Sequence, residues 1–513
     1  MMTLLSWLLA ASPVLVVLIM MVGWRKSALV AGSGGWLVAA AVAIVWFGAG
    51  ADLIVVAQGK ALLMALDVLL IIWTALLLFR VTNEAGALNV LGEQLTRLTP
   101  DRVLQALLLG WMFISFLQGV GGFGVPVAVV APLLLTLGFT PTAAILIATL
   151  GHAWGSTFGS LASAFQALIA TSGLSGYALA PQAAAMLGLA GLAGGICAAY
   201  VAGGWSGLRR NLGTILLVGA VMGGVQWGLA SLGLWTIAAF SAGLAGVGVG
   251  VLLARRGAAH RVQERPATDG DNRKLALSLS AYAILIVLAI TIQAIPPIKA
   301  ALGHVVLRLK FPQVQTALGY VTPAELGRVI SLLNHTGLVL ALTSLLAFGV
   351  YTAAGWYKPG AGRRILATTL RSLLEPTLGI IAMVGMAAIM SHAGLTDVLA
   401  RGLATAVGGA FPLVSPFIGA LGAFMTGSNT NSNVVFVMLQ MRTANLLNLD
   451  VLVIIAAQTT GAALGSVISP AKVIVGCSST GQSGREGLMM RAMLPYILAI
   501  LALVAIVTLL AAR

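Results

Sequence analysis

GVGGFGVP, at residues 119–126, interrupts one hydrophobic stretch of this chain, and TGSNTNSN, at residues 426–433, interrupts another. Each is followed by a further apolar segment that contains small and polar residues, GHAWGSTFGS at 151–160 and AAQTTGAALGS at 456–466. Backbone that leaves the helical conformation inside a membrane needs protein, water or a ligand to satisfy its polar groups. Paired interruptions in the two halves of a membrane protein therefore predict the binding site of a transported solute.

The composition indicates an all-α, polytopic membrane protein. Of 513 residues, 59% are hydrophobic and only 8% are charged, and the 62 glycines suit closely packed or broken helices. The net charge of +15 comes largely from short loops between apolar segments, which is typical of cytoplasmic loops and does not indicate nucleic-acid binding. We find no GxSxG, HExxH or Walker motif and no Cys/His cluster, so the sequence predicts no metal site and no cofactor. A membrane-embedded enzyme or receptor is the alternative from a different class.

Hydrophobic segments of about 20 residues predict membrane-spanning helices. Twelve such segments lie at residues 4–22, 28–50, 62–82, 141–164, 181–204, 212–232, 234–254, 275–295, 329–351, 366–390, 450–475 and 490–511. Two more, residues 104–138 and 403–440, carry the interruptions in their middle, and we expect each to be a re-entrant hairpin. With both hairpins non-crossing, the basic loops are cytoplasmic, including the linker 255–274, and both termini are external. The exception is the external segment 296–326, which contains basic residues.

The two halves of the chain resemble each other in order. Aligned pairs are Asp67 with Glu375 and Gly86 with Gly394 at an offset of 308, and Gly121 with Gly427 at an offset of 306. Segment 62–82 is predicted to run inward and segment 366–390 outward, so the halves form inverted repeats, as in many secondary transporters. We expect N-terminal helices (1–60), repeat 1 (61–170), connecting helices (171–365), repeat 2 (366–478) and a C-terminal helix (479–513).

Residues at the interruptions have the chemistry to bind a small carboxylate. Glycine permits a tight turn at the first tip, and hydroxyls and amides at the second tip cap the half-helix that follows. N–H groups exposed at such helix starts carry partial positive charge, which suits an anion. The candidate substrate-binding residues are Gln118, Gly121, Gly122, Gly124, His152, Trp154, Ser428, Asn429, Thr430, Asn431, Ser432, Gln458, Thr459 and Lys472.

Several of these candidates have a structural alternative. His152, at the position equivalent to Gln458, either contacts the solute, carries a coupled proton or is a structural histidine. Trp154 either lines the site or packs in the core. Lys472 is either a counter-charge for an anion or extends to the cytoplasmic surface. Asp67 and Glu375 are the other candidates for proton coupling, or are structural near the membrane surface.

Three strings resemble a known family. FLQGVGGFGVPVAVVAPLL (116–134), FMTGSNTNSNVVFVMLQ (424–440) and QTTGAALGSVISPAKVIVGC (458–477) are similar to sequences of the lactate permease family, bacterial transporters of lactate and glycolate. The resemblance implies proton-coupled uptake of short 2-hydroxymonocarboxylates across the inner membrane, and a fold like that of ion transporters with two hairpins and two broken helices. Members of that family carry glutamate where this chain has Gln118, and some carry aspartate in place of Asn429. The coupling ion, a proton or alternatively sodium, therefore stays open, and the alternative function is a sodium-coupled carrier of another small organic anion.

Overall fold

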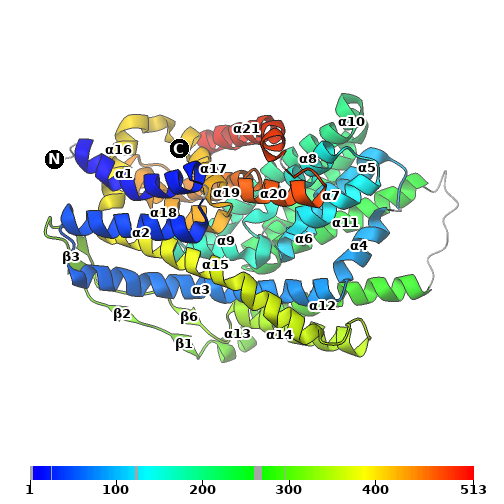
Figure 1. Ribbon diagram of the computed structural model, residues 1–513, viewed down its shortest axis with the longest axis horizontal. Helices are drawn as coiled ribbons and strands as arrows, with labels where there is room; N and C mark the ends of the chain where they lie inside the picture. Colours follow the sequence, from blue (N-terminus) through cyan, green and yellow to red (C-terminus); the bar gives the residue numbers. More distant parts are fainter. Residues whose placement is uncertain are drawn as a thin grey trace.

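The computed structural model describes residues 4–24, 26–96, 98–121, 125–258, 269–293, 295–483 and 485–512. Over these residues the protein is a helical membrane protein, as predicted, and twelve helices are long and apolar enough to cross a membrane. Figure 1 shows most of them running side by side along the long axis of the molecule. Helices dominate because an apolar environment leaves each backbone N–H and C=O to be satisfied within its own segment.

The first repeat contains the first hairpin. Its elements are α3 (Ala51–Glu84), α4 (Ala87–Thr96), α5 (Arg102–Leu107), the π-helical turn η2 (Leu108–Phe113), α6 (Ile114–Val120), α7 (Val125–Thr136), α8 (Pro141–His152), the 3-10 turn η3 (Ala153–Ser156) and α9 (Gly159–Ser172). After α7 the chain returns to the start of α5, where Arg102 Nη2 donates to the Gly138 carbonyl at 2.6 Å. The Arg102 guanidinium also lies 4.6 Å from the centre of the Phe139 ring. The segment expected to be a hairpin thus folds back on itself.

The second repeat has the same order of elements. These are α15 (Ala361–His392), α16 (Leu395–Val407), the 3-10 turn η4 (Gly408–Ala410), α17 (Phe411–Thr426), α18 (Asn429–Leu446), α19 (Val451–Val467) and α20 (Pro470–Ser479). Near the open end of the hairpin, Gln440 Nε2 in α18 donates to the Ser415 carbonyl in α17 at 2.9 Å. The hairpin covers residues 411–446 rather than the expected 403–440, because Gly408 (φ 52, ψ −135) ends α16 and Pro412 lies in the first turn of the new helix α17.

The first expected helix break lies where the sequence places it. α8 ends at His152, and Ser160, Leu161 and Ala162 all have positive φ values of 45, 57 and 64. Three consecutive residues without glycine's freedom rarely adopt this conformation, so surrounding contacts must hold it. The break separates α8 from the part of α9 that follows Ala162.

The second expected break, at residues 456–466, is wrong in position. α19 runs without interruption to Val467, and the chain leaves the helix only at Ile468, before Pro470 begins α20. Gly461 and Gly465 serve close helix packing instead. A Cβ atom at either position would collide with backbone carbonyl oxygens of α17. Small residues in apolar segments can either interrupt a helix or let two helices pack closely, and the sequence pattern does not distinguish these roles.

Local backbone geometry repeats between the two halves. The equivalent positions are the left-handed Gly86 and Gly394 after α3 and α15, the left-handed Gly138 and Asn448 after the hairpins, and the N-caps Thr140 of α8 and Asp450 of α19. In Figure 1 the first hairpin lies toward the end of the molecule that carries α5, and the second toward the end that carries α16 and the N-terminus. The paired geometry and these opposite positions fit two inverted repeats.

The remaining helices surround the repeats. They are α1 (Leu4–Leu18), its π-helical continuation η1 (Ile19–Gly23), α2 (Ala28–Val45), α10 (Gly176–Ser231), α11 (Trp235–Ala258), α12 (Asp269–Gln293), α13 (Pro296–Leu302), α14 (Thr336–Ala353) and α21 (Glu486–Ala511). α10 bends sharply at Gly204 (φ 61, ψ −160), so the helices expected at 181–204 and 212–232 are its two arms. The twelve apolar helices therefore differ from the expected twelve segments. They count α10 once, leave out the broken segment 141–164, and include residues 102–119 and 395–426.

A β-ribbon between α13 and α14 is absent from the sequence prediction. Its strands are β1 (Val306–Leu307), β2 (Lys310–Phe311), β3 (Val314–Gln315), β4 (Val321–Thr322), β5 (Glu325–Leu326) and β6 (Ile330–Ser331), paired antiparallel as β1–β6, β2–β5 and β3–β4. Ala317 N donates to the Gly48 carbonyl at 2.8 Å, which ties the ribbon tip to the turn before α3. The helix expected at 329–351 begins only at Thr336, because His335 caps it by accepting from Gly337 N at 3.1 Å.

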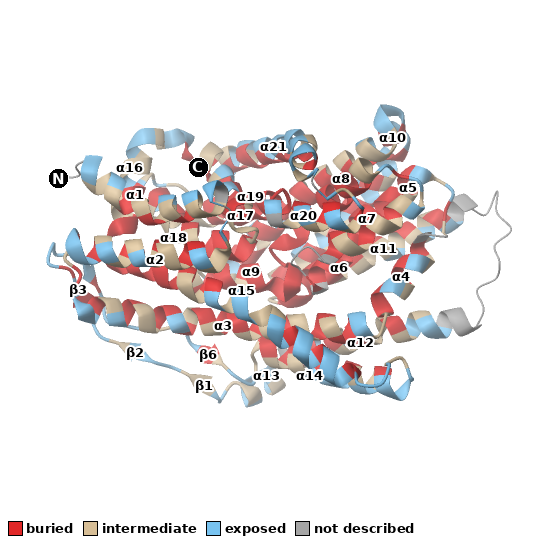
Figure 2. Ribbon diagram, in the orientation of Figure 1, coloured by how far each residue is buried: buried red, intermediate tan, exposed pale blue. Residues whose placement is uncertain are grey.

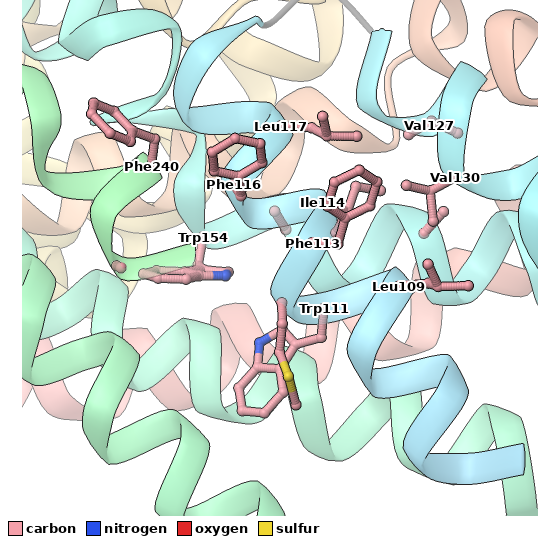
Figure 3. Packing of buried hydrophobic residues seen from close by; sticks show 14 of the residues in the cluster. Leu109, Trp111, Phe113, Ile114, Phe116, Leu117, Val127, Val130, Trp154 and Phe240 are labelled. Atoms are coloured by element: carbon pink, nitrogen blue, oxygen red, sulfur yellow. The ribbon is translucent and has the colours of Figure 1, made fainter. Parts of the chain in front are cut away.

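Buried residues concentrate where the two repeats meet, while the outer helices and the ribbon are more exposed (Figure 2). Figure 3 shows the aromatic packing around the first hairpin, with Trp111, Phe116 and Trp154 in one region. Contact between α6 and α11 depends on glycine, because a Cβ at Gly119 would collide with the backbone of Phe240. This close packing fixes the hairpin against the rest of the protein.

Candidate functional site

A buried polar cluster forms where the first helix break meets the second hairpin. Thr157 Oγ1 lies 3.1 Å from Thr459 Oγ1 and 3.2 Å from the Thr459 carbonyl oxygen. Asn429 Nδ2, at the start of α18, donates to Thr157 Oγ1 at 3.0 Å. Asn433 Nδ2 donates to Thr459 Oγ1 at 3.0 Å and to the Ala164 carbonyl at 3.1 Å. Side chains from both repeats thus share one hydrogen-bond network.

The asparagine oxygens of this cluster lack hydrogen-bond partners among the described residues. Backbone carbonyls only accept, so the Ala164 carbonyl fixes Asn433 with its Nδ2 toward α9 and its Oδ1 away. Asn429 Oδ1, Asn433 Oδ1 and the Ser156 hydroxyl are all buried and unpaired. Buried polar atoms are normally satisfied, so unpaired oxygens in one place indicate a ligand site. Such oxygens suit a hydroxyl donor or a cation.

Gln118 lies against the first helix break. A Cβ at Gly159 would lie 2.7 Å from the Gln118 carbonyl oxygen, and one at Gly155 would lie 3.5 Å from Gln118 Cγ. The Gln118 Oε1 atom is buried without a partner in the described part of the chain. Gly121 follows at the end of α6, beside Phe79 of α3. Gly122 and Gly124 lie outside the described residues.

His152 is fully buried at the end of α8. Its Nδ1 lies 2.8 Å from the Ala148 carbonyl, and its Nε2 has no partner among the described residues. Trp154 has a packing role, because its Nε1 donates to Ser115 Oγ and to the Gly151 carbonyl, each at 3.1 Å. Its ring also occupies the space beside Gly191 of α10.

Gln458 does not mirror His152. Its Nε2 donates to Ser432 Oγ at 3.2 Å, and its Oε1 accepts from Gln440 Nε2. Ser432 in turn donates to the Gly419 carbonyl at 2.7 Å. These side chains therefore hold the second hairpin against α19 rather than facing the first break.

The other candidates at the second tip are placed around the start of α18. Ser428 is the N-cap, and its hydroxyl accepts from Asn431 N at 3.3 Å. Thr430 and Asn431 are buried in the first turn. Lys472, on α20, is half-buried and donates to Ser466 Oγ at the end of the preceding helix α19, at 3.0 Å.

The two acidic candidates lie apart from the cluster. Asp67 is buried between Arg328 Nε at 2.8 Å and His335 Nε2 at 3.0 Å. Glu375 is exposed on α15. Within the described residues, no group of three or more metal-ligating side chains is present.

Sequence reasoning missed two members of the cluster. Ser156 and Thr157 lie inside the first interruption that the sequence singles out, but their side chains are not among the candidates, whereas Asn433 lies at the second tip, where side-chain caps and ligands are expected. The signal was the interruption itself, since a hydroxyl or amide in non-helical backbone is the type of group that satisfies a partner helix. Which of several neighbouring polar residues faces the other repeat depends on tertiary packing.

Comparison with known proteins adds independent information. Residues 6–513 match the family described as L-lactate permease. The chain is 27% identical to the glycolate permease GlcA of Escherichia coli K12, with 99% of this chain and 96% of that protein covered. It is 25% identical to an L-lactate permease of Salmonella typhimurium, with 98% and 95% covered. Among solved structures, the Alcanivorax borkumensis YdaH transporter covers 86% of this chain and 84% of its own, with a TM-score of 0.46 and 16% identity.

Proposed function

The chain belongs to the L-lactate permease family, and we propose that it is a secondary transporter of a short 2-hydroxymonocarboxylate such as lactate or glycolate. Its full-length similarity to proteins named for these two solutes supports the substrate class. The structural observation that carries the proposal is the cluster of Thr157, Asn429 and Thr459, where both repeats meet beside unpaired buried oxygens.

The cluster offers separate contacts for the two groups of a 2-hydroxy acid. Ser428 caps α18 and takes the N–H of Asn431, which leaves the first N–H groups of the helix for a carboxylate. The unpaired Oδ1 of Asn429 accepts the hydrogen bond of the 2-hydroxyl group. A solute without that hydroxyl leaves this oxygen unpaired, at a cost of about 1–3 kcal/mol.

A co-transported cation accompanies the carboxylate. None of the described cluster residues has an ionised side chain, and an uncompensated charge inside the membrane is costly. We assign this role to a proton at His152 Nε2, because Nδ1 is already held by the Ala148 carbonyl. Sodium is the alternative, since hard cations prefer oxygen ligands such as those of Asn429 and Asn433.

Inverted repeats supply the means of alternating access. The cluster joins the first break to the second hairpin, so movement of one repeat against the other exposes it to each side in turn. We place the protein in the bacterial inner membrane, with both termini and the β-ribbon on the external side, because the basic loops then face the cytoplasm.

The test is uptake into proteoliposomes that contain the purified protein, with pH and sodium gradients imposed separately. L-lactate and glycolate should accumulate when the lumen is alkaline, whereas pyruvate and acetate, which lack the 2-hydroxyl group, should compete about tenfold or more weakly. Accumulation driven only by sodium would select the alternative cation. Equal competition by acetate would contradict the assigned hydroxyl contact, and no uptake of any 2-hydroxy acid would contradict the proposed function.

A further inference from the structure

A cavity of about 520 Å³ lies outside the polar cluster, between the β-ribbon and the helix bundle. Its walls come from α3, the end of α9, the ribbon, the last turns of α15 and the end of α18. Ala170 of α9 and Met438 of α18 line it. The α9 and α18 residues Ala164 and Asn433, which are bonded in the cluster, lie 6 and 5 residues earlier, or roughly 8–9 Å along each helix. The cavity therefore continues the same helix interface toward the outside.

The charged lining of this cavity is mainly basic. Lys60, Arg328 and Arg442 line it, and Glu325 is the one acidic side chain among the described lining residues. Arg328 Nε lies 2.8 Å from Asp67, and Arg442 Nη1 lies 2.7 Å from Asp397. Those two aspartates are not part of the cavity lining, so they hold the guanidinium groups without adding negative charge to the cavity wall. The space itself faces more positive than negative charge.

Lys60 is the centre of this arrangement. Its side chain is only 2% exposed, whereas that of Glu325, whose Oε1 lies 2.8 Å from Lys60 Nζ, is 53% exposed. A buried ammonium group needs a carboxylate partner, and that carboxylate can belong to the protein or to a bound solute. A small carboxylate in the cavity can take the place of Glu325, which then turns to water.

His392 adds a hydrogen-bond acceptor. It lines the cavity at the end of α15, and its Nδ1 lies 2.8 Å from the Ala388 carbonyl. Because that carbonyl only accepts, Nδ1 carries the hydrogen and Nε2 of the neutral ring is an acceptor. Nε2 is buried and unpaired within the described part of the chain. Arg442 Nη2 also donates to Ser391 Oγ at 3.0 Å, next to His392.

We propose that this cavity is a second, outer binding site for a small 2-hydroxymonocarboxylate, which rests on the proposed function. The carboxylate pairs with Lys60 and Arg442 in exchange for Glu325, and the 2-hydroxyl group donates to His392 Nε2. The solute is thereby captured and concentrated one to two helical turns above the cluster. Charge complementarity in such a recess raises the rate of capture more than the affinity of the inner site.

The test is chemical labelling of a cysteine in the cavity, which does not require transport. Met64 lines the cavity without taking part in its ion pairs. In full-length protein in which Cys197 and Cys477 are replaced, Met64→Cys should react faster with an anionic methanethiosulfonate than with a cationic one, relative to free thiol. Leu318→Cys, exposed on the ribbon outside the cavity and between uncharged neighbours, is the matched control and should show no such preference.

Saturating L-lactate should slow labelling of Met64→Cys about tenfold, because a site nine-tenths occupied leaves a tenth of the thiols open. Glu325→Gln should lower the L-lactate concentration needed for protection, since it removes the competing carboxylate. Lys60→Gln and Arg442→Gln should abolish both protection and anion preference. His392→Phe should weaken protection by L-lactate but not by acetate.

Two outcomes separate this site from the proposed function. Protection of Met64→Cys at an unchanged L-lactate concentration in Asn429→Ala, whose KM for uptake is raised, supports an outer site distinct from the cluster. Labelling that L-lactate does not slow, in protein that still transports L-lactate, would overturn the outer site alone. Faster labelling of Met64→Cys by the cationic reagent, with the rest of the cavity lining unchanged, would overturn it as well.

Discussion

At the scale of single residues, unpaired oxygens identify the inner site better than charge does. Asn429 bonds Thr157 through its Nδ2 and leaves its Oδ1 without a partner among the described residues, so the same side chain joins the repeats and offers an acceptor to a ligand. Gln458, equally buried, is fully engaged with the second hairpin. The sequence places both residues in interruptions, but only the structure distinguishes a shared contact from an internal one.

Asn429→Ala should raise the KM for L-lactate by about tenfold, which corresponds to about 1.4 kcal/mol for one good polar contact. Asn445→Ala is the matched control, because Asn445 is exposed at the far end of the same helix. Both KM values come from initial rates of L-lactate uptake in proteoliposomes. An unchanged KM for Asn429→Ala in correctly inserted protein would reassign the residue to packing.

His152→Gln should abolish L-lactate accumulation driven by a pH gradient while L-lactate counterflow survives. The substitution removes titration at Nε2 but keeps a side chain that can donate to the Ala148 carbonyl. His304→Gln, at an exposed histidine outside the bundle helices, serves as the control. Full pH-driven accumulation by His152→Gln would exclude histidine as the proton carrier and favour sodium coupling.

At the scale of elements, hydrophobic length and matched interruptions predict the hairpins and the first helix break, since both follow from local sequence. They misplace the second break because Gly461 and Gly465 look like interruptions but accommodate α17. The β-ribbon escapes prediction for a related reason. Its six strands have two residues each, which is too short for an alternating apolar and polar pattern to emerge. They are stabilised by pairing between the two arms of the β-ribbon.

Gly461→Ala should lower the thermal stability of the purified protein strongly, because the added Cβ meets the backbone of Pro416 and cannot be relieved by a side-chain rotation. Gly224→Ala is the control, since a Cβ there meets no atom within 4 Å. The two melting temperatures can be compared by thermal shift in detergent. Equal values would show that α17 and α19 are not in close contact.

At the scale of the whole molecule, two inverted repeats imply that the hairpins open on opposite sides. Pro100→Cys and Thr136→Cys flank the first hairpin at exposed positions, and Thr405→Cys and Asn445→Cys flank the second. An impermeant maleimide should reach the first pair only from the cytoplasmic face and the second only from the external face. Labelling of one pair from opposite faces would show a crossing helix and contradict the repeat arrangement.

Locating the bound solute tests the central claim, that the solute binds between the repeats, most directly. An experimental structure of the full-length protein in lipid nanodiscs, determined with and without saturating L-lactate, would do so. The account predicts added density at the start of α18, within hydrogen-bonding distance of Asn429 and beside Thr157 of the first break. Density confined to sites that these two residues do not touch, in protein that transports L-lactate, would contradict the account.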